Sequence, residues 1–223
     1  MKHGRLIIIE AGDGSGKETQ TGLLFDRLKK EGKTVEKVTF PDYDSDSSAL
    51  VRMYLGGSFG KRAADVNAYA ASAFFAVDRY ASFQLKWRHL YESGAIIMAD
   101  RYTTSNMVHQ AVKIVDEAER EQFLNWLWDF EFQKMGLPVP DRVIFLDMAP
   151  EVADRLIALR AEKNSQEKDI HERDKEYLRR CYSAYGEIAD KYGWKRIICS
   201  ENGEPRTREA IAEEVYNAVK DLL

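Results

Sequence analysis

The stretch that most constrains this chain is residues 6–20, which read LIIIEAGDGSGKETQ. The opening run of leucine and isoleucine is too short for a helix, and β-branched residues favour a strand that is buried on both faces. Three glycines alternate with polar residues after this run, and Lys17 then leads into a helical pattern. Strand, glycine-rich loop and helix, in that order, are the context in which a phosphate-binding loop is credible. Inward-pointing amides and a helix N-terminus would hold an anion there, and Lys17 could reach the phosphates of a nucleotide.

The loop departs from the G-x-x-x-x-G-K-[ST] pattern at both ends. Ala11 replaces the first glycine, and Glu18 replaces the hydroxyl residue that usually binds Mg²⁺. One alternative is a tight turn that carries a surface lysine. A dinucleotide-binding loop is disfavoured because Lys17 occupies the third glycine position of G-x-G-x-x-G. The residues predicted to bind ATP are Gly12, Asp13, Gly14, Ser15, Gly16, Lys17, Glu18 and Thr19.

The length and composition are those of one ordinary domain. We predict that all 223 residues form it, since this length can bury a sizeable core. The formal net charge of −4 does not indicate a nucleic-acid-binding surface. Cys181 and Cys199 lack the spacing of metal ligands. We expect no membrane span and no signal peptide, and therefore a cytoplasmic protein with no nucleic-acid or membrane partner.

Beyond the loop, short apolar runs alternate with helical patterns. Strands are predicted over residues 34–40, 95–100, 142–147 and 194–200. Helices are predicted over residues 17–31, 49–55, 65–93, 104–112, 116–135, 151–162, a segment that ends at 192, and 206–223. Strands separated by helices require crossover connections, so the predicted fold is α/β, with a five-stranded parallel sheet and helices on both faces. The carboxyl ends of such strands share one rim, where ligands bind. The glycine loop and Asp100 are both expected on that rim.

Four segments carry a resemblance to a known family. They are DRY at residues 100–102 with Ser105, Asn106 and Gln110 downstream, FFAVDR at 74–79, PDRVIFLD at 140–147, and a charged region at 160–172. By their order and spacing the chain resembles, over almost its whole length, the thymidylate kinases. These are P-loop enzymes that transfer the γ-phosphoryl group of ATP to dTMP. The resemblance implies a P-loop NTPase-type fold and a helical lid at about residues 160–172.

The resemblance also implies how the acceptor nucleotide is bound. Phe75 would stack on the thymine ring and Arg79 would donate a hydrogen bond to its carbonyl edge. The two residues are four apart, so they share one helical face. The alternatives are core packing for Phe75 and a salt bridge to a neighbouring carboxylate for Arg79. The remaining substrate-binding residues implied by the family are Arg101, Asn106, Gln110, Tyr43 and Glu172.

Catalysis would depend on positive charge around the transferred group, because phosphoryl transfer needs little covalent help from the protein. By resemblance, Arg101 grips the acceptor phosphate, and Asp100 helps to place Mg²⁺. Asp13 would approach the metal or that phosphate. Family members bring a further arginine from the glycine loop or from the lid. Ser15 occupies the loop position here, so Arg160 of the lid is the predicted source. The alternative for Asp100 is that it caps the following helix.

Two acidic residues break the family pattern. Asp42 stands where many relatives carry an arginine for the acceptor phosphate, and either Arg52 or Lys61 could replace that cation. Glu18 would repel a triphosphate, since two like unit charges about 4 Å apart repel by about 1 kcal/mol in water and about 4 kcal/mol at an effective dielectric constant of about 20. We therefore hypothesise that Glu18 binds Mg²⁺ in place of a hydroxyl, since carboxylates are good ligands for that ion. The alternative is that Glu18 points away and that Thr19 or Asp100 holds the metal.

Together these features predict an enzyme that converts ATP and dTMP to ADP and dTDP with Mg²⁺. Relatives dimerise through helices packed side by side, so a homodimer is implied, with the segments 49–55 and 65–93 as the contact surface. His109 is expected to be an exposed helical residue. One alternative function is a kinase for a different nucleotide or a nucleoside. The other is a nucleotide-binding homologue with impaired catalysis, which the residues Ala11, Glu18 and Asp42 motivate.

Overall fold

A computed structural model describes residues 3–161, 169–171 and 174–223. Within these residues five strands form one parallel sheet in the order β2-β3-β1-β4-β5. Their bounds are β1 Arg5–Ala11, β2 Val35–Thr39, β3 Ile96–Asp100, β4 Arg142–Asp147 and β5 Lys195–Ile198. The predicted five-stranded parallel sheet is thus confirmed. A short hairpin that the sequence patterns did not predict, β6 Ser200–Glu201 with β7 Glu204–Pro205, follows β5.

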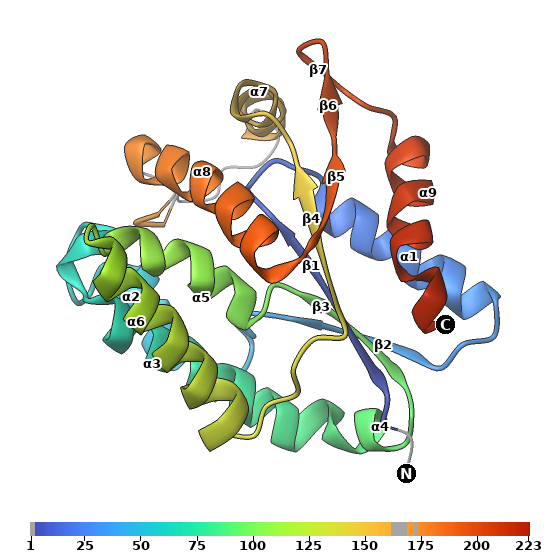
Figure 1. The fold of residues 1–223 in the computed structure, drawn as a ribbon, viewed down its shortest axis with the longest axis horizontal. Helices are drawn as coiled ribbons and strands as arrows, with labels where there is room; N and C mark the ends of the chain where they lie inside the picture. Colours follow the sequence, from blue (N-terminus) through green and yellow to red (C-terminus); the bar gives the residue numbers. More distant parts are fainter. Residues whose placement is uncertain (1–2, 162–168, 172–173) are drawn as a thin grey trace.

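The helices cover both faces of this sheet (Figure 1). Their bounds are α1 Lys17–Lys30, α2 Ala49–Leu55, α3 Ala68–Ser82, α4 Arg88–Glu92, α5 Thr103–His109, α6 Glu117–Trp128, α7 Pro150–Ala161, α8 Lys175–Tyr192 and α9 Arg208–Val219. Strand alternation directs Ile7 and Ile9 of β1 into one cluster with residues of α1 and α9. Leu6 and Ile8 enter a second cluster, on the opposite face, with Trp87. The central strand is therefore buried on both sides, as its unbroken apolar run predicts.

Two predicted helices contain a wider turn that the sequence does not announce. The predicted helix 65–93 begins at Ala68 and is interrupted between α3 and α4 by a π-helical segment, Phe83–Trp87. A second π-helical segment, Asp129–Lys134, continues α6. Insertions of this kind are rare and often lie at functional sites, because they change which side chains face a neighbour.

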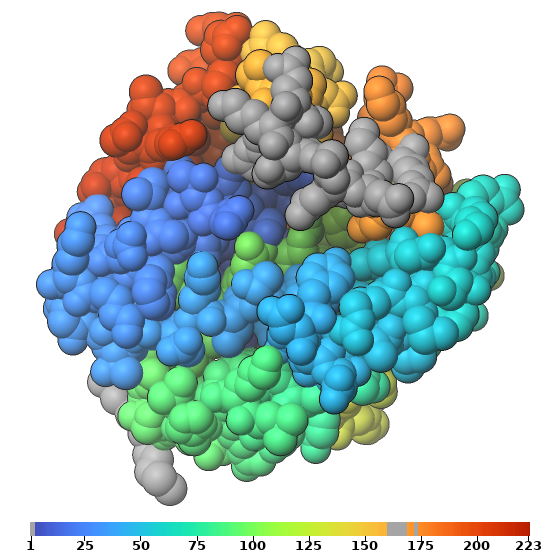
Figure 2. Space-filling model, turned by 180° about the vertical axis from the view of Figure 1, so that it is seen from behind, coloured from blue at the N-terminus to red at the C-terminus, as the bar shows by residue number. Residues whose placement is uncertain are grey.

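The carboxyl ends of β1, β3 and β4 meet at one rim, which places the glycine loop beside Asp100. In Figure 2, N-terminal residues in blue and residues of α2 and α3 in cyan flank a hollow on this face. The predicted lid falls mostly on residues 162–168 and 172–173, which lie outside the described residues. No helix among the residues that the structure describes is long and apolar enough to cross a membrane.

Candidate active site

The glycine loop joins β1 to α1 through two residues in the left-handed backbone region. Gly14 has φ 76° and Gly16, the residue that caps α1, has φ 79°. A Cβ atom on Gly14 would also lie 2.7 Å from the carbonyl oxygen of Ala153 in α7. Both the positive φ and this close approach therefore favour glycine at position 14. Ala11, by contrast, is the last residue of β1 and has no positive φ, which explains why alanine is tolerated there.

Lys17 lies at the first position of α1 and points back across the rim. Its ammonium group donates to the carboxylate of Asp100, the last residue of β3. Both side chains are mostly buried but retain some exposure, 15% for Lys17 and 13% for Asp100. Burial lowers the pKa of Lys17, and the nearby Arg101 adds to that effect while Asp100 opposes it. Asp100 therefore lies beside the glycine loop, where Lys17 holds it, and it does not cap α5.

Arg101 faces the loop from the residue after β3. Its Nη2 donates to Asp13 Oδ1 at 2.7 Å and its Nη1 lies 3.3 Å from the Tyr185 hydroxyl oxygen. Its φ of 65° is unusual for a residue with a Cβ and costs roughly 1–3 kcal/mol. The surrounding fold therefore imposes this backbone conformation, and it directs the guanidinium toward the loop rather than along the strand.

Glu10, which sequence reasoning missed, is the buried carboxylate beneath this arrangement. It accepts hydrogen bonds from the hydroxyls of Thr104 at 2.5 Å, Ser105 at 2.8 Å and Tyr185 at 3.3 Å, and from the Tyr102 amide at 3.3 Å. Burial raises its pKa, although these donors and the neighbouring cations oppose the shift. The carboxylate ties β1 to the start of α5. The available signal was an acid that continues an otherwise apolar buried strand.

A cavity of about 370 Å³ runs along the glycine loop, where the sequence predicts ATP binding, and it is called the donor cavity below. It is lined by every predicted ATP-binding residue except Thr19, and by Thr21, Lys37, Thr39 and Asp100. Glu18 is exposed in this cavity, and no hydrogen bond or ion pair links its side chain to another described residue. It is thus free to meet an incoming ligand.

A larger cavity of about 530 Å³ adjoins it and is called the acceptor cavity below, because the predicted substrate-binding residues line it. The predicted substrate-binding residues Tyr43, Phe75, Arg79, Arg101, Asn106 and Gln110 all line this one cavity. Glu172 lies outside the described residues, and for Arg160 the structure describes only its place in α7. The structure therefore brings together six side chains that come from three separate stretches of the sequence.

Phe75 and Arg79 both reach the wall of this cavity from α3. Phe75 is half-buried, with its ring edge-on to Tyr54 at 6.2 Å between centroids. Arg79 is fully buried and forms a two-point ion pair with Glu131. The sequence left open whether Arg79 faces the cavity or forms a salt bridge, and the structure shows that it does both.

Gln110 has the least satisfied side chain on that wall. Its amide is fully buried next to the Tyr54 hydroxyl, yet neither its nitrogen nor its oxygen has a hydrogen-bond partner of good geometry among the described residues. Buried amides are normally paired, so an unpaired one that lines a cavity is suited to a polar ligand.

Asp42 turns away from the acceptor cavity. Its carboxylate pairs with Lys86, and its backbone amide donates to Asp78 Oδ2 at 2.8 Å. The charge of Asp42 is thus neutralised at the surface and does not oppose an acceptor phosphate. Arg52 and Lys61, the two candidates to replace the arginine that many relatives carry at this position, do not line the acceptor cavity. Arg52 instead donates to the carbonyl oxygens of Tyr43 and Ser45.

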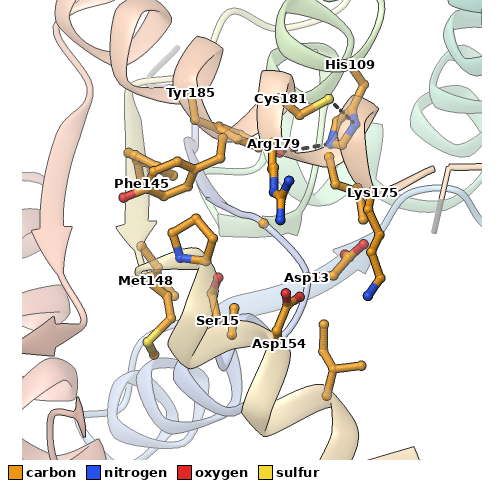
Figure 3. Close-up of a pocket in the computed structure, with 17 residues that line it drawn as sticks. Asp13, Ser15, His109, Phe145, Met148, Asp154, Lys175, Arg179, Cys181 and Tyr185 are labelled. Atoms are coloured by element: carbon orange, nitrogen blue, oxygen red, sulfur yellow. Dashed lines mark hydrogen bonds between the residues drawn. The ribbon is translucent and has the colours of Figure 1, made fainter. Parts of the chain in front are cut away.

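His109 is not the exposed residue that the helical pattern predicted. It lies in the wall between the acceptor cavity and a smaller cavity of about 100 Å³ between α7 and α8, shown in Figure 3. Its Nε2 lies 3.2 Å from the Tyr185 hydroxyl and its Nδ1 lies 3.5 Å from Cys181 Sγ. Burial lowers the pKa of His109 to about 3, so the ring is neutral in the folded protein. The prediction failed because α8, which is remote in sequence, covers this face of α5.

The carboxylates Asp13, Glu18 and Asp100 around the loop fit a magnesium ion. No group of three or more acidic, histidine or cysteine residues among the described parts of the chain is gathered into a preformed metal cluster. Mg²⁺ is commonly bound by one or two carboxylates together with waters and substrate phosphates, so this sparse set suits it. Of these three carboxylates, Glu18 is the one without a hydrogen-bond or ion-pair partner among the described residues.

Comparison with known proteins agrees with this geometry. The family profile described as thymidylate kinase matches residues 9–211. A thymidylate kinase of Mycobacterium tuberculosis is 31% identical over 191 residues, which cover 85% of this chain and 87% of that protein. The thymidylate kinase of Clavibacter sepedonicus is 29% identical over 94% of this chain and 97% of its own.

The fold is shared with a solved structure as well. That structure, of thymidylate kinase from Candida albicans, superposes with a TM-score of 0.71 at 22% identity and covers 98% of this chain and 92% of its own. The family profile spans the glycine loop, the DRY segment and both cavities, and the sequence identity extends over most of the chain. This chain therefore belongs to the thymidylate kinase family of ATP-dependent nucleoside monophosphate kinases.

Proposed function

We propose that this protein transfers the γ-phosphoryl group of ATP to dTMP and releases ADP and dTDP. The observation that carries the proposal is that the donor and acceptor cavities share a boundary. Asp13, Lys17, Glu18 and Asp100 line both cavities, so a nucleotide in each would bring its terminal phosphate to the same gap. Positioning two reactants in this way supplies a large part of the rate enhancement in phosphoryl transfer.

Positive charge at the gap stabilises the transferring group. Lys17 approaches from the donor loop, and Arg101 approaches from the acceptor side. Arg160 is proposed to add a third cation from the end of α7. The acceptor phosphate is already an anion, so the reaction needs no general base. Fixed cations at the point where charge develops lower the barrier without reorganising at the moment of reaction.

The wall of the larger cavity supports recognition of a pyrimidine nucleotide. Phe75 offers an aromatic edge and face for stacking, while Arg79 donates to a carbonyl group. Gln110 and Asn106 supply amides to the base and sugar, and Arg101 holds the acceptor phosphate. We propose that Tyr43 and Glu172 complete the binding site for dTMP.

Asp100, Glu18 and Asp13 are proposed to hold Mg²⁺ with the ATP phosphates, with Glu18 in the place of the usual hydroxyl. When bound, the ion supplies charge neutralisation for the phosphate oxygens. Lys17, which now pairs with Asp100, is the side chain that would exchange part of this contact for a phosphate oxygen.

We further propose that residues 1–223 act as one domain in a cytoplasmic homodimer, with ATP and dTMP as ligands. Apolar side chains lie exposed on α2, α3 and the π-helical segment after α3, including Leu50, Met53, Val77, Tyr80 and Leu85. Exposed apolar clusters of this kind are suited to a contact between protein chains. Measuring the molar mass by light scattering during size-exclusion chromatography tests the dimer.

A coupled assay of ADP release over a panel of nucleoside monophosphates and nucleosides tests the function. We expect fast turnover with dTMP and slower turnover with the other acceptors. Preference for another acceptor would reassign the substrate, and tight binding of ATP and dTMP without turnover would indicate an impaired homologue.

A further inference from the structure

Two of the three guanidinium nitrogens of Arg79 are held by Glu131. Arg79 Nε donates to Glu131 Oε2 at 2.7 Å and Nη2 donates to Oε1 at 2.5 Å. The exposed fraction is 2% for the arginine side chain and 0% for the glutamate side chain. A two-point pair of this kind fixes both the position and the plane of the guanidinium group.

Glu131 is itself fixed by the π-helical segment Asp129–Lys134 and by Thr103. The Thr103 hydroxyl, on the first residue of α5, donates to Glu131 Oε2 at 2.7 Å. The carboxylate therefore accepts three hydrogen bonds and lies between α3, α5 and the continuation of α6. Such a fully satisfied network leaves the arginine no alternative partner on that side.

Nη1 is the remaining nitrogen of Arg79, and Arg79 lines the acceptor cavity. Its described contact is with the Tyr102 carbonyl oxygen at 3.5 Å, which is long for a hydrogen bond. Each terminal guanidinium nitrogen carries two hydrogens and no acceptor, so Nη1 can only donate. A ligand group that meets it must therefore offer an oxygen or nitrogen lone pair.

From this geometry we infer that Glu131 is a positioning residue that determines which pyrimidine base the enzyme accepts. By holding Nε and Nη2, it presents Nη1 as a fixed donor to the carbonyl edge of the base. Cytosine carries an amino group where uracil and thymine carry a carbonyl oxygen, so it would set donor against donor. The inference rests on the proposed function, since it assumes that the acceptor base occupies this cavity.

A purely structural role for the pair is the competing explanation. Buried ion pairs contribute little net stability, and well-packed apolar residues of similar volume often serve as well. The two roles differ in what they predict. A structural pair would affect all ligands equally when weakened, whereas a positioning pair would affect ligands according to the group that faces Nη1.

The test uses calorimetry to compare the binding of dTMP, dUMP and dCMP to the unaltered protein and to the variant Glu131→Gln. The probes dUMP and dCMP both lack the methyl group, so they differ only at the edge in question. Glutamine can accept from one guanidinium N–H but opposes the other with its own NH₂, which frees the arginine to move. We expect the affinity for dTMP and dUMP to fall at least about tenfold, which corresponds to the loss of one charged hydrogen bond. The affinity for dCMP should change less than about threefold, because that base makes no such bond.

A milder variant covers the case in which Glu131→Gln does not fold. Thr103→Val removes one hydrogen bond to Glu131 and keeps the ion pair, so we expect the same selectivity loss at about threefold. The matched control is Asp147→Asn, which weakens a different ion pair, with Arg196, outside both nucleotide cavities. It should lower the melting temperature without changing the ratio of dUMP to dCMP affinity.

An equal loss of affinity for dUMP and dCMP in these variants would overturn the inference and leave Glu131 a structural residue. Failure of the proposed function is a separate result, since the unaltered protein would then show no turnover of dTMP in the acceptor panel. A preserved turnover of dTMP in Glu131→Gln, with an unchanged Michaelis constant, would also contradict the positioning role.

Discussion

Two ion pairs, each with at least one member in the wall of the acceptor cavity, differ in how far they are exposed to solvent. Lys17 and Asp100 lie at the phosphate gap and keep 15% and 13% of their side-chain surface exposed. Arg79 and Glu131 lie at the base-binding wall and keep 2% and 0%. The partly exposed pair can exchange partners when phosphates and a cation arrive. The buried pair, Arg79 and Glu131, cannot exchange partners in this way, because leaving either charge unpaired in the interior carries a large desolvation cost.

Under the proposed function, the more exposed pair belongs to the residues that act on the phosphates, and the buried pair belongs to the residues that select the base. The cations proposed to act on the phosphates retain some exposure to solvent, 15% for the Lys17 side chain and 20% for the Arg101 side chain. Arg79, the proposed base-recognition residue, is instead held by Glu131 through two of its three guanidinium nitrogens. Replacing residues of the gap should therefore change rates, while replacing residues of the wall should change selectivity.

The largest expected effect comes from breaking the pair at the gap. Lys17→Met removes the loop cation, and we expect kcat with dTMP to fall by about 10²–10³-fold, as for loss of one stabilising donor in a transition state. The ratio of dUMP to dCMP affinity should stay unchanged. Steady-state kinetics at saturating ATP measure the rate, and Lys191→Met, at a surface ion pair with Glu121, is the control. A loss of less than threefold would remove Lys17 from the reaction.

A middle-sized effect tests how the gap holds its metal ion. Glu18→Thr replaces an exposed carboxylate by the hydroxyl that the loop pattern usually has. If Glu18 binds Mg²⁺, we expect the Mg²⁺ concentration for half-maximal rate to change by about tenfold, roughly 1.4 kcal/mol. Titration of Mg²⁺ at fixed ATP measures it, with the exposed Glu187→Thr as control. An unchanged dependence would show that Glu18 does not ligate the ion.

The smallest expected effect concerns the wall beside α8. The pKa of His109 lies at about 3 in the folded protein and near its ordinary value of 6.5 in the unfolded chain. Between these values the unfolded chain binds more protons, so the stability contributed by His109 is complete above pH 6.5 and is lost as the pH falls toward 3. Between pH 7 and 5.5 the free energy of unfolding should fall further in the unaltered protein than in His109→Gln, by about 1 kcal/mol.

Urea unfolding at the two pH values measures this difference. The same measurement on His89→Gln, at a histidine of the short helix α4 that lines neither nucleotide cavity, controls for the change from histidine to glutamine. Parallel stability curves for His109→Gln and the unaltered protein would place His109 in contact with solvent and contradict its burial.

Features that depend on neighbours along the chain could be predicted from the amino-acid sequence. The glycine loop was predictable because Gly14 and Gly16 adopt backbone conformations that disfavour other residues. The parallel sheet was predictable because strands buried on both faces need unbroken apolar runs. The family resemblance then identified residues that line the acceptor cavity. It did not show that Arg79 lines this cavity and also forms a salt bridge with Glu131.

The partners of the charged side chains could not be predicted, because they depend on how the chain folds in space. Glu10, Asp42, Glu131 and His109 each look like ordinary helix, loop or strand residues along the chain, and each acquires its role from a partner 36 or more positions away. The two π-helical segments are equally invisible in the sequence, because the extra residue is accommodated by packing against neighbours. Electrostatic energy depends on distance in space and on burial, and neither quantity can be read from spacing along a chain.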